Sequence, residues 1–191
     1  MKITVQAACG FLAAVAASPG LAQPAPPRLA VEAPNYVSIP MEITVNRPAA
    51  EVWKRVGKFC EIGEWLQIPA GCQITSGSDG QVGAVRTVGR EIMVGRTELS
   101  YTYTQPVYEG RAYNLYHGTL EARPLTPETS KIVYTLMYDN SGIAGDGAAK
   151  QTEIQRRRTN FERALGNMKT LAEGGTLPPP PPRPVMATPS R

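Results

Sequence analysis

Polar side chains that can donate or accept a proton lie on the predicted strands of the chain's middle and second half. They are Arg86, Tyr101, Tyr103, Tyr113, His117 and Tyr134. A buried tyrosine or histidine can act as a general acid or base, and an arginine can bind a carboxylate or a developing oxyanion. The same residue types also suit an ordinary half-buried sheet, where packing alone favours tyrosine. Their chemistry therefore depends on whether they face an enclosed space.

No complete catalytic set accompanies these residues in the sequence. His117 is the single histidine of the chain, and the sequence identifies no partner for it. It is either a proton shuttle or a residue at the surface or in the core whose hydrogen bonds are satisfied within the protein. Arg86 either contacts a ligand or forms a structural ion pair, and the sequence favours neither. The chain has no GxSxG, HExxH or Walker-type motif, and one histidine without a CxxC pair predicts no zinc site. The sequence assigns no catalytic residue, metal or cofactor.

The elements that must position these residues begin with a strand and two short helices. Residues 41–46 alternate weakly and suit a first strand. Residues 48–56 carry apolar side chains at helical spacing, and Pro48 suits the first turn with its cap at Asn46 or Arg47. Gly57 interrupts this pattern, and residues 59–65 can form a second short helix.

Six further strands and one long helix complete the expected order. The strands are predicted at 72–76, 82–88, 91–94, 99–104, 111–123 and 131–138. The helix is predicted at 148–173, with an apolar stripe that includes Ile154, Phe161, Leu165, Met168 and Leu171. A meander of this length must bury one face, and only the last helix is long enough to cover it. The sequence predicts an α+β fold in which a curved seven-stranded antiparallel sheet wraps around the long C-terminal helix.

This order and three local motifs resemble one known superfamily. The motifs are Pro48-Ala-Ala-Glu-Val-Trp53, Phe59-Cys-Glu-Ile-Gly-Glu-Trp65 and Val82-Gly-Ala-Val-Arg-Thr87. Over residues 40–174 the chain resembles the SRPBCC (START-like) superfamily, and its polyketide cyclase/dehydrase and lipid-transport branch in particular. The resemblance implies a helix-grip fold with a pocket for a hydrophobic or aromatic small molecule between sheet and helix.

The resemblance also bears on the candidate residues. It implies that the strand residues named above face the pocket. It also implies that Trp65 lies near the mouth of the pocket, where it either gates entry or packs against neighbouring side chains. The segment 89–97 is shorter than the hairpin of many relatives, which implies a more open rim. Some members of the superfamily catalyse reactions, so an aldol-type cyclisation assisted by Tyr101, Tyr103 or His117 is an alternative function.

The N-terminus is typical of a secretory signal peptide. Lys2 precedes a mostly apolar run over 3–17, and small residues stand at Gly20 and Ala22. The alternative, a membrane anchor, is disfavoured because the run is shorter than the roughly 20 residues that span a bilayer. We expect cleavage near Ala22 and a periplasmic or secreted protein with no transmembrane segment in the mature chain.

Export changes how the cysteines are interpreted. Removal of residues 1–22 removes Cys9 and leaves Cys60 and Cys72 as one possible pair in an oxidising compartment. Such a bridge would contribute about 3 kcal/mol by the chain-entropy relation. The alternative is two buried free thiols that pack as small hydrophobic groups.

The charge pattern does not indicate nucleic-acid binding. The formal charge of +4 falls to +3 when Lys2 is removed with the signal (4 − 1 = 3). The densest basic run, residues 156–158, lies in the final helix, where successive side chains point about 100° apart. We therefore expect a solvated helix face and no nucleic-acid partner.

Proline-rich segments flank the expected domain. Residues 23–39 are predicted to be a linker, and 175–191 a tail with prolines at 178–182 and 184. Such a tail is either a stiff disordered spacer or a ligand for a groove-type domain. The sequence thus favours an exported binding protein for a small hydrophobic or lipid-like ligand. The alternatives are the cyclase/dehydrase and a protein-interaction module that acts through the tail.

Overall fold

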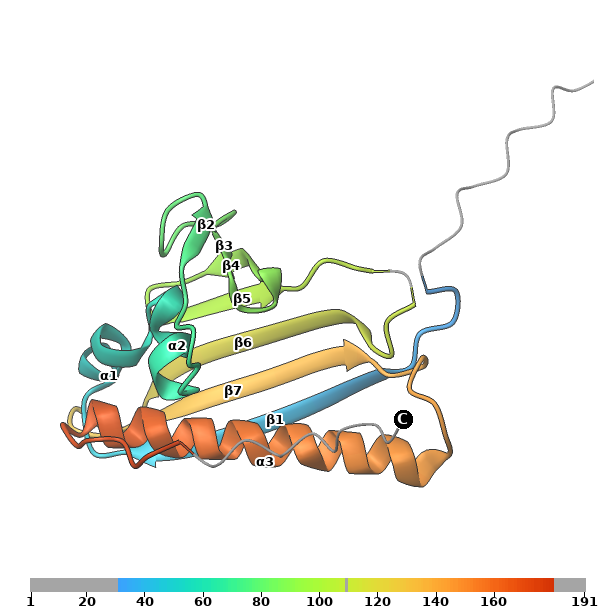
Figure 1. Cartoon of the computed structure of the whole chain (residues 1–191). Coiled ribbons are helices and arrows are strands. Elements are labelled where there is room, and N and C mark those ends of the chain that lie inside the picture. Colours follow the sequence, from blue (N-terminus) through green and yellow to red (C-terminus); the bar gives the residue numbers. More distant parts are fainter. Residues whose placement is uncertain (1–30, 109, 181–191) are drawn as a thin grey trace, which may run out of the picture.

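The computed structural model describes residues 31–108 and 110–180. The expected signal peptide and the end of the proline-rich tail lie outside the described residues. Figure 1 shows a curved sheet with one long helix, α3, running beside it and two short helices at one end. The sheet has seven antiparallel strands in the order β1-β7-β6-β5-β4-β3-β2, which confirms the α+β helix-grip fold predicted from the sequence.

The elements follow the chain in the predicted order. They are β1 (Tyr36–Val45), α1 (Ala49–Val56), η1 (Phe59–Glu61), α2 (Ile62–Trp65), β2 (Ile74–Ser76), β3 (Val85–Arg86), η2 (Val88–Arg90), β4 (Ile92–Arg96), β5 (Ser100–Thr104), β6 (Asn114–Pro124), β7 (Ser130–Asp139) and α3 (Gly147–Ala172). Within the described ranges, no helix is long and apolar enough to cross a bilayer.

The first strand is longer than the sequence predicts. It starts at Tyr36 instead of residue 41, so it includes Pro40 and the last residues of the predicted linker, 36–39. Proline lacks a backbone N–H and is tolerated in a sheet mainly at its edge. Since β1 pairs only with β7, it is such an edge strand. Pro48, expected inside the first turn of α1, is instead its N-cap residue.

The predicted hairpin over residues 82–94 is reduced to short strands. β3 has 2 residues, and a 3₁₀ turn replaces the end of the expected first arm. Within that turn Gly89 has φ 60° and Arg90 has φ 53°. Two successive residues in the left-handed region are typical of the type I′ hairpin turn, and the backbone N–H of Glu91 donates to the carbonyl of Val88 across it. The chain therefore reverses at Gly89-Arg90, as the sequence predicts.

The long helix α3 has a clear start and one buried face. The carboxylate of Asp146 accepts hydrogen bonds from the backbone N–H of Ala148 and Ala149, at 3.0 and 3.1 Å, and so caps the first turn. The buried face consists of Arg157, Phe161, Ala164, Leu165, Asn167, Met168 and Leu171. The predicted stripe is confirmed from Phe161 onwards, whereas Ile154 is only partly buried.

Beyond α3 the chain turns back towards α2. Leu177 packs against the core, and the carbonyl of Pro178 accepts a hydrogen bond of 2.6 Å from the Gln67 side chain. The described start of the proline-rich tail is therefore in contact with the domain.

A disulfide joins Cys60 in η1 to Cys72 just before β2, as the sequence predicts. The Cα atoms are 5.3 Å apart, and the bridge spans a separation of 12 residues. It fastens the short helices to the narrow end of the sheet, where β2 and β3 form few ladder hydrogen bonds.

We predict that the double variant Cys60→Ser/Cys72→Ser has a lower free energy of unfolding, by about 2–4 kcal/mol, because the unfolded chain regains the entropy of the closed loop. Urea denaturation of the oxidised proteins measures the difference. A reducing agent should lower the stability of the wild-type protein towards that of the variant and leave the variant unchanged. Equal stability of the wild type with and without reductant would contradict the prediction.

Candidate functional site

The concave face of the sheet presents a row of buried aromatic side chains towards α3. The row consists of Tyr101 and Tyr103 on β5, Tyr116 on β6, and Tyr134 and Tyr138 on β7, each at most 4% exposed. Successive side chains on a strand alternate between its faces. The spacing of two residues on β5 and of four on β7 therefore places these rings on one side of the sheet.

Arg86 lies at the narrow end of this row and is fully buried. Its guanidinium is 2.5 Å from the carboxylate of Glu91 and also donates to the backbone carbonyl of Phe59. Its central carbon lies 4.1 Å from the centre of the Phe59 ring and 4.7 Å from that of Tyr103, within cation–π distance. The second oxygen of Glu91 accepts a hydrogen bond of 3.0 Å from Gln105. Arg86 is therefore an ion-paired interior residue that also forms part of the aromatic wall.

The ionisation of this pair reflects its burial. Burial alone would lower the pKa of Arg86, but Tyr101 and Glu91 nearby raise it above its ordinary value. Burial raises the pKa of Glu91, an effect that Arg86 and Gln105 oppose. With the two charged groups in direct contact, the guanidinium remains a cation held against its carboxylate.

Two tyrosine hydroxyls meet in the middle of the interior. The Oη atoms of Tyr103 and Tyr134 are 2.8 Å apart and form a buried hydrogen bond. A β-carbon on Gly118 would lie 2.3 Å from the Tyr103 ring, so the missing side chain on β6 is what lets that ring lie across the neighbouring strand. Trp65 packs edge-on against Tyr134, with ring centres 6.1 Å apart.

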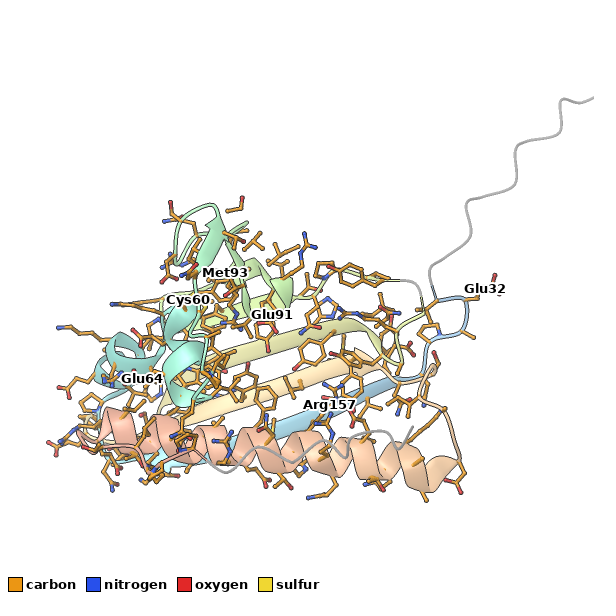
Figure 2. The ribbon with its side chains drawn as sticks, viewed as in Figure 1. Glu32, Cys60, Glu64, Glu91, Met93 and Arg157 are labelled. Atoms are coloured by element: carbon orange, nitrogen blue, oxygen red, sulfur yellow. A yellow bond between two sulfur atoms is a disulfide. The ribbon has the colours of Figure 1, made fainter. Side chains whose placement is uncertain are left out.

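A second buried arginine enters the interior from α3. Figure 2 shows Arg157 projecting from the helix towards the sheet. Its guanidinium carbon lies 4.1 Å from the centre of the Tyr113 ring and 4.5 Å from that of Tyr138, and its Nε is 2.8 Å from Glu153. The basic run was expected to form a solvated face. Its side chains do fan out, but this fan turns Arg157 inward, where it is 8% exposed.

Several interior polar atoms have no hydrogen-bond partner among the described residues. They are Trp65 Nε1, Tyr101 Oη, Tyr138 Oη and Gln105 Oε1. The guanidinium groups of Arg86 and Arg157 lie near the Tyr101 and Tyr138 hydroxyls and oppose the rise that burial causes in their pKa values, but neither forms a well-aligned hydrogen bond with them. Arg86 Nη2 and Arg157 Nε also lack a well-aligned hydrogen bond, but each lies within ion-pair distance of a carboxylate. Buried polar groups without partners are uncommon in folded proteins. The hydrogen-bonding capacity of these atoms is therefore not used by the described residues.

His117 lies on the opposite face of the sheet from the tyrosines, so it does not face the interior as the sequence suggests. β6 has a register shift between Asn114 and His117, with Leu115 at φ 51°. This irregularity changes which residues face α3. Tyr113 and Tyr116 contact each other, at 5.8 Å between ring centres, and the ring of His117 instead meets the carbonyl of Leu115 at 2.8 Å.

The interior tyrosines are suited to donate protons in hydrogen bonds and not to abstract them. Burial raises the pKa of Tyr103 and Tyr134 well above the ordinary value. It also raises the pKa of Tyr101 and Tyr116. All four hydroxyls are therefore protonated at neutral pH.

The structure brings most of the predicted site residues together and adds others. Arg86, Tyr101, Tyr103, Tyr134 and Trp65 are in the interior, and Tyr113 is at its edge. Sequence reasoning missed Glu91, Tyr116, Tyr138 and Arg157 as parts of this cluster. Tyr138 shares its alternation with Tyr134 and had a usable signal, whereas Arg157 had none beyond its place in the helical stripe.

Comparison with known proteins gives one family. A family described as "Polyketide cyclase / dehydrase and lipid transport" matches residues 36–173. A comparison with curated proteins finds no match.

Solved structures with a similar fold include proteins of several bacteria. One from Nitrosospira multiformis has a TM-score of 0.56 at 20% identity and covers 70% of this chain and 94% of its own. One from Thermobifida fusca has a TM-score of 0.55 at 24% identity, with coverage of 73% and 97%. The Zhui aromatase/cyclase of a Streptomyces species has a TM-score of 0.53 at 18% identity, with coverage of 74% and 100%. At these identities the likeness concerns the fold alone.

We predict that Arg86→Met lowers the free energy of unfolding by about 3–5 kcal/mol, because it leaves Glu91 buried without its partner. The double variant Arg86→Met/Glu91→Leu should lose less than Arg86→Met alone, since it removes the unpaired charge. Urea denaturation of the single and double variants tests both statements. Arg123→Met, which breaks the exposed pair with Glu121, is the control and should change stability little. A double variant less stable than Arg86→Met would contradict the assignment.

Proposed function

We propose that this chain, which belongs to the polyketide cyclase/dehydrase and lipid transport family, is an exported binding protein for a small hydrophobic ligand. The ligand would lie between the concave face of the sheet and α3. The observation that carries the proposal is the set of partnerless polar atoms on an otherwise aromatic wall, namely Trp65 Nε1, Tyr101 Oη and Tyr138 Oη.

The energetics of these atoms support a binding role. A buried donor or acceptor without a partner costs about 1–3 kcal/mol each. An apolar side chain of similar shape, such as phenylalanine in place of tyrosine, would avoid that cost. Polar groups retained at such positions are explained if a ligand supplies the missing hydrogen bonds.

The charge balance of the interior supports a neutral ligand. Both buried arginines face a carboxylate, Arg86 with Glu91 and Arg157 with Glu153, and Glu153 is shared with the exposed Arg156. Neither cation needs an external anion, and an unpaired charged group would be costly to bury here. We therefore favour an aromatic or lipid-like molecule with hydroxyl or carbonyl groups over a carboxylic acid.

A cyclase or dehydrase reaction has weaker support. The chain's single histidine lies on the far face of the sheet, and the interior tyrosines have raised pKa values that suit donors and not bases. Tyr103 and Tyr134 can orient a ligand carbonyl, but neither is placed beside a base of ordinary pKa. The protein-interaction role of the proline-rich tail stays a separate prediction.

Export is supported by two independent features. The first is the N-terminal pattern of Lys2, an apolar run and small residues before Gln23. The second is the bond between Cys60 and Cys72, since structural disulfides persist mainly in oxidising compartments.

Fractionation of a Gram-negative host that expresses the full chain tests export. We expect the protein in the periplasm, with an intact mass that starts at or near Gln23 and with Cys60 and Cys72 resistant to thiol alkylation. A matched chain without residues 1–22 should stay in the cytoplasm with both thiols reactive. A full-length protein that keeps its N-terminus in the cytoplasm would refute the export proposal.

The binding role is tested first by native mass spectrometry and organic extraction of the purified full chain, and then by titration with the neutral probe 6-propionyl-2-(dimethylamino)naphthalene, whose carbonyl oxygen can accept hydrogen bonds. We expect Tyr101→Phe and Tyr138→Phe each to weaken binding about two- to tenfold, the value of one hydrogen bond. The unliganded variants should be as stable as the wild type or more so, because each loses a hydroxyl that has no partner.

Tyr103→Phe is the matched control. Its hydroxyl already bonds Tyr134, so removing it should destabilise the unliganded protein by about 0.5–1.5 kcal/mol. If Tyr101→Phe and Tyr138→Phe destabilise the protein as Tyr103→Phe does and leave probe binding unchanged, their hydroxyls are structural and the proposal fails.

A further inference from the structure

We propose that the protein has a second binding site, outside the interior, that takes an aromatic anion. The site is a groove of about 470 Å³ between α1 and the turn from β4 to β5, at the end of the sheet that carries the short helices. Its lining includes Trp53, Lys54, Lys58, Asp79, Arg96 and Tyr101. A volume of this size is within the range of small-molecule sites.

One wall of the groove is a face of α1 and the residues just after it. Trp53 and Gly57 are four residues apart and therefore lie on the same side of the helix. A β-carbon on Gly57 would lie 2.3 Å from the indole of Trp53. Gly57 thus lets the indole lie flat over the end of the helix and form part of the lining of the groove.

The opposite wall is held in place by specific contacts. Asp79, in the loop between β2 and β3, accepts a hydrogen bond of 3.1 Å from the backbone N–H of Phe59. The guanidinium of Arg96 donates to the backbone carbonyl of Gly80. These contacts tie the loop to η1 on one side and to β4 on the other. The groove is therefore a built feature of the fold and not a gap between loose segments.

The floor of the groove separates it from the interior. Tyr101 and Met93 are each 2% exposed, and the Tyr101 ring packs against Trp53 with ring centres 5.7 Å apart. Figure 2 shows Met93 on β4, above the central strands in this view. On its interior side, Tyr101 faces Arg86, whose guanidinium carbon is 6.0 Å from the ring centre. A ligand in the groove would contact the outer side of this wall.

The charges around the groove favour an anion. Lys54, Lys58 and Arg96 give three positive charges against one negative charge from Asp79 (3 − 1 = 2). Lys58 lies 3.9 Å from Glu61, but its side chain is 68% exposed and can turn to the groove. Apolar rings under a basic rim suit a flat aromatic body that carries a carboxylate or sulfonate. This differs from the neutral ligand proposed for the interior, where both arginines are already paired.

Titration with 1-anilinonaphthalene-8-sulfonate, an aromatic anion, tests the site in the full chain. We expect the double variant Lys54→Ala/Lys58→Ala to bind this probe about three- to tenfold more weakly, as the loss of two exposed charge contacts would give. Both lysines are exposed, so folding should be unaffected. Arg47→Ala/Lys150→Ala removes the same net charge away from the groove and should bind the probe as the wild type does. The uncharged probe N-phenyl-1-naphthylamine should bind both double variants equally.

The two tryptophans report where the anion binds. Trp53 borders the groove and Trp65 is buried in the interior, so their indole N–H signals in a two-dimensional ¹H–¹⁵N spectrum distinguish the sites. Groove binding should shift the Trp53 signal and leave that of Trp65 in place. A shift confined to Trp65, unchanged affinity in Lys54→Ala/Lys58→Ala, or an equal loss for the uncharged probe would each overturn the proposal.

Discussion

The buried guanidinium of Arg86 is the contact on which the narrow end of the domain depends. It joins β3 to Glu91, to the carbonyl of Phe59 in η1, and to the faces of two aromatic rings. The strands there are only 2 and 3 residues long, so their ladder hydrogen bonds are too few to fix the chain. One cation with partners on three segments, together with the adjacent disulfide, takes over that role.

The same contact determines what the interior offers to a ligand. Arg86 and Arg157 each face a carboxylate, and that of Glu153 is shared with the exposed Arg156. The region between sheet and helix therefore has an ion pair at two points and aromatic rings between them. The remaining capacity for hydrogen bonds comes from uncharged groups, the Tyr101 and Tyr138 hydroxyls and the Trp65 indole. On the outer side of the Tyr101 wall the balance is different, because Lys54 of α1 and Lys58 just after it are exposed. One layer of side chains thus separates two surfaces of different chemistry.

Local patterns in the sequence were enough to predict the fold but not every side-chain position. Alternation in β5 and β7 and the apolar stripe of α3 are direct consequences of strand and helix geometry, so Tyr101, Tyr134 and Phe161 were placed correctly. The irregularity at Leu115 depends on pairing with a distant strand, and it decides that Tyr116 faces inward and His117 does not. Likewise, one arginine of a basic run is turned inward by packing against tyrosines that lie far away in the sequence. Such outcomes depend on tertiary contacts that a single sequence does not display.

The glycine beneath Tyr103 links the sizes of two side chains on neighbouring strands. Since the Tyr103 ring occupies the volume in which a side chain at position 118 would stand, the two positions share one fixed space. A larger residue at 118 requires a smaller one at 103, so the side chain at one position constrains the other. Paired substitutions at these two positions would thereby redistribute side-chain volume between β5 and β6, while the pairing of the two strands stays as it is.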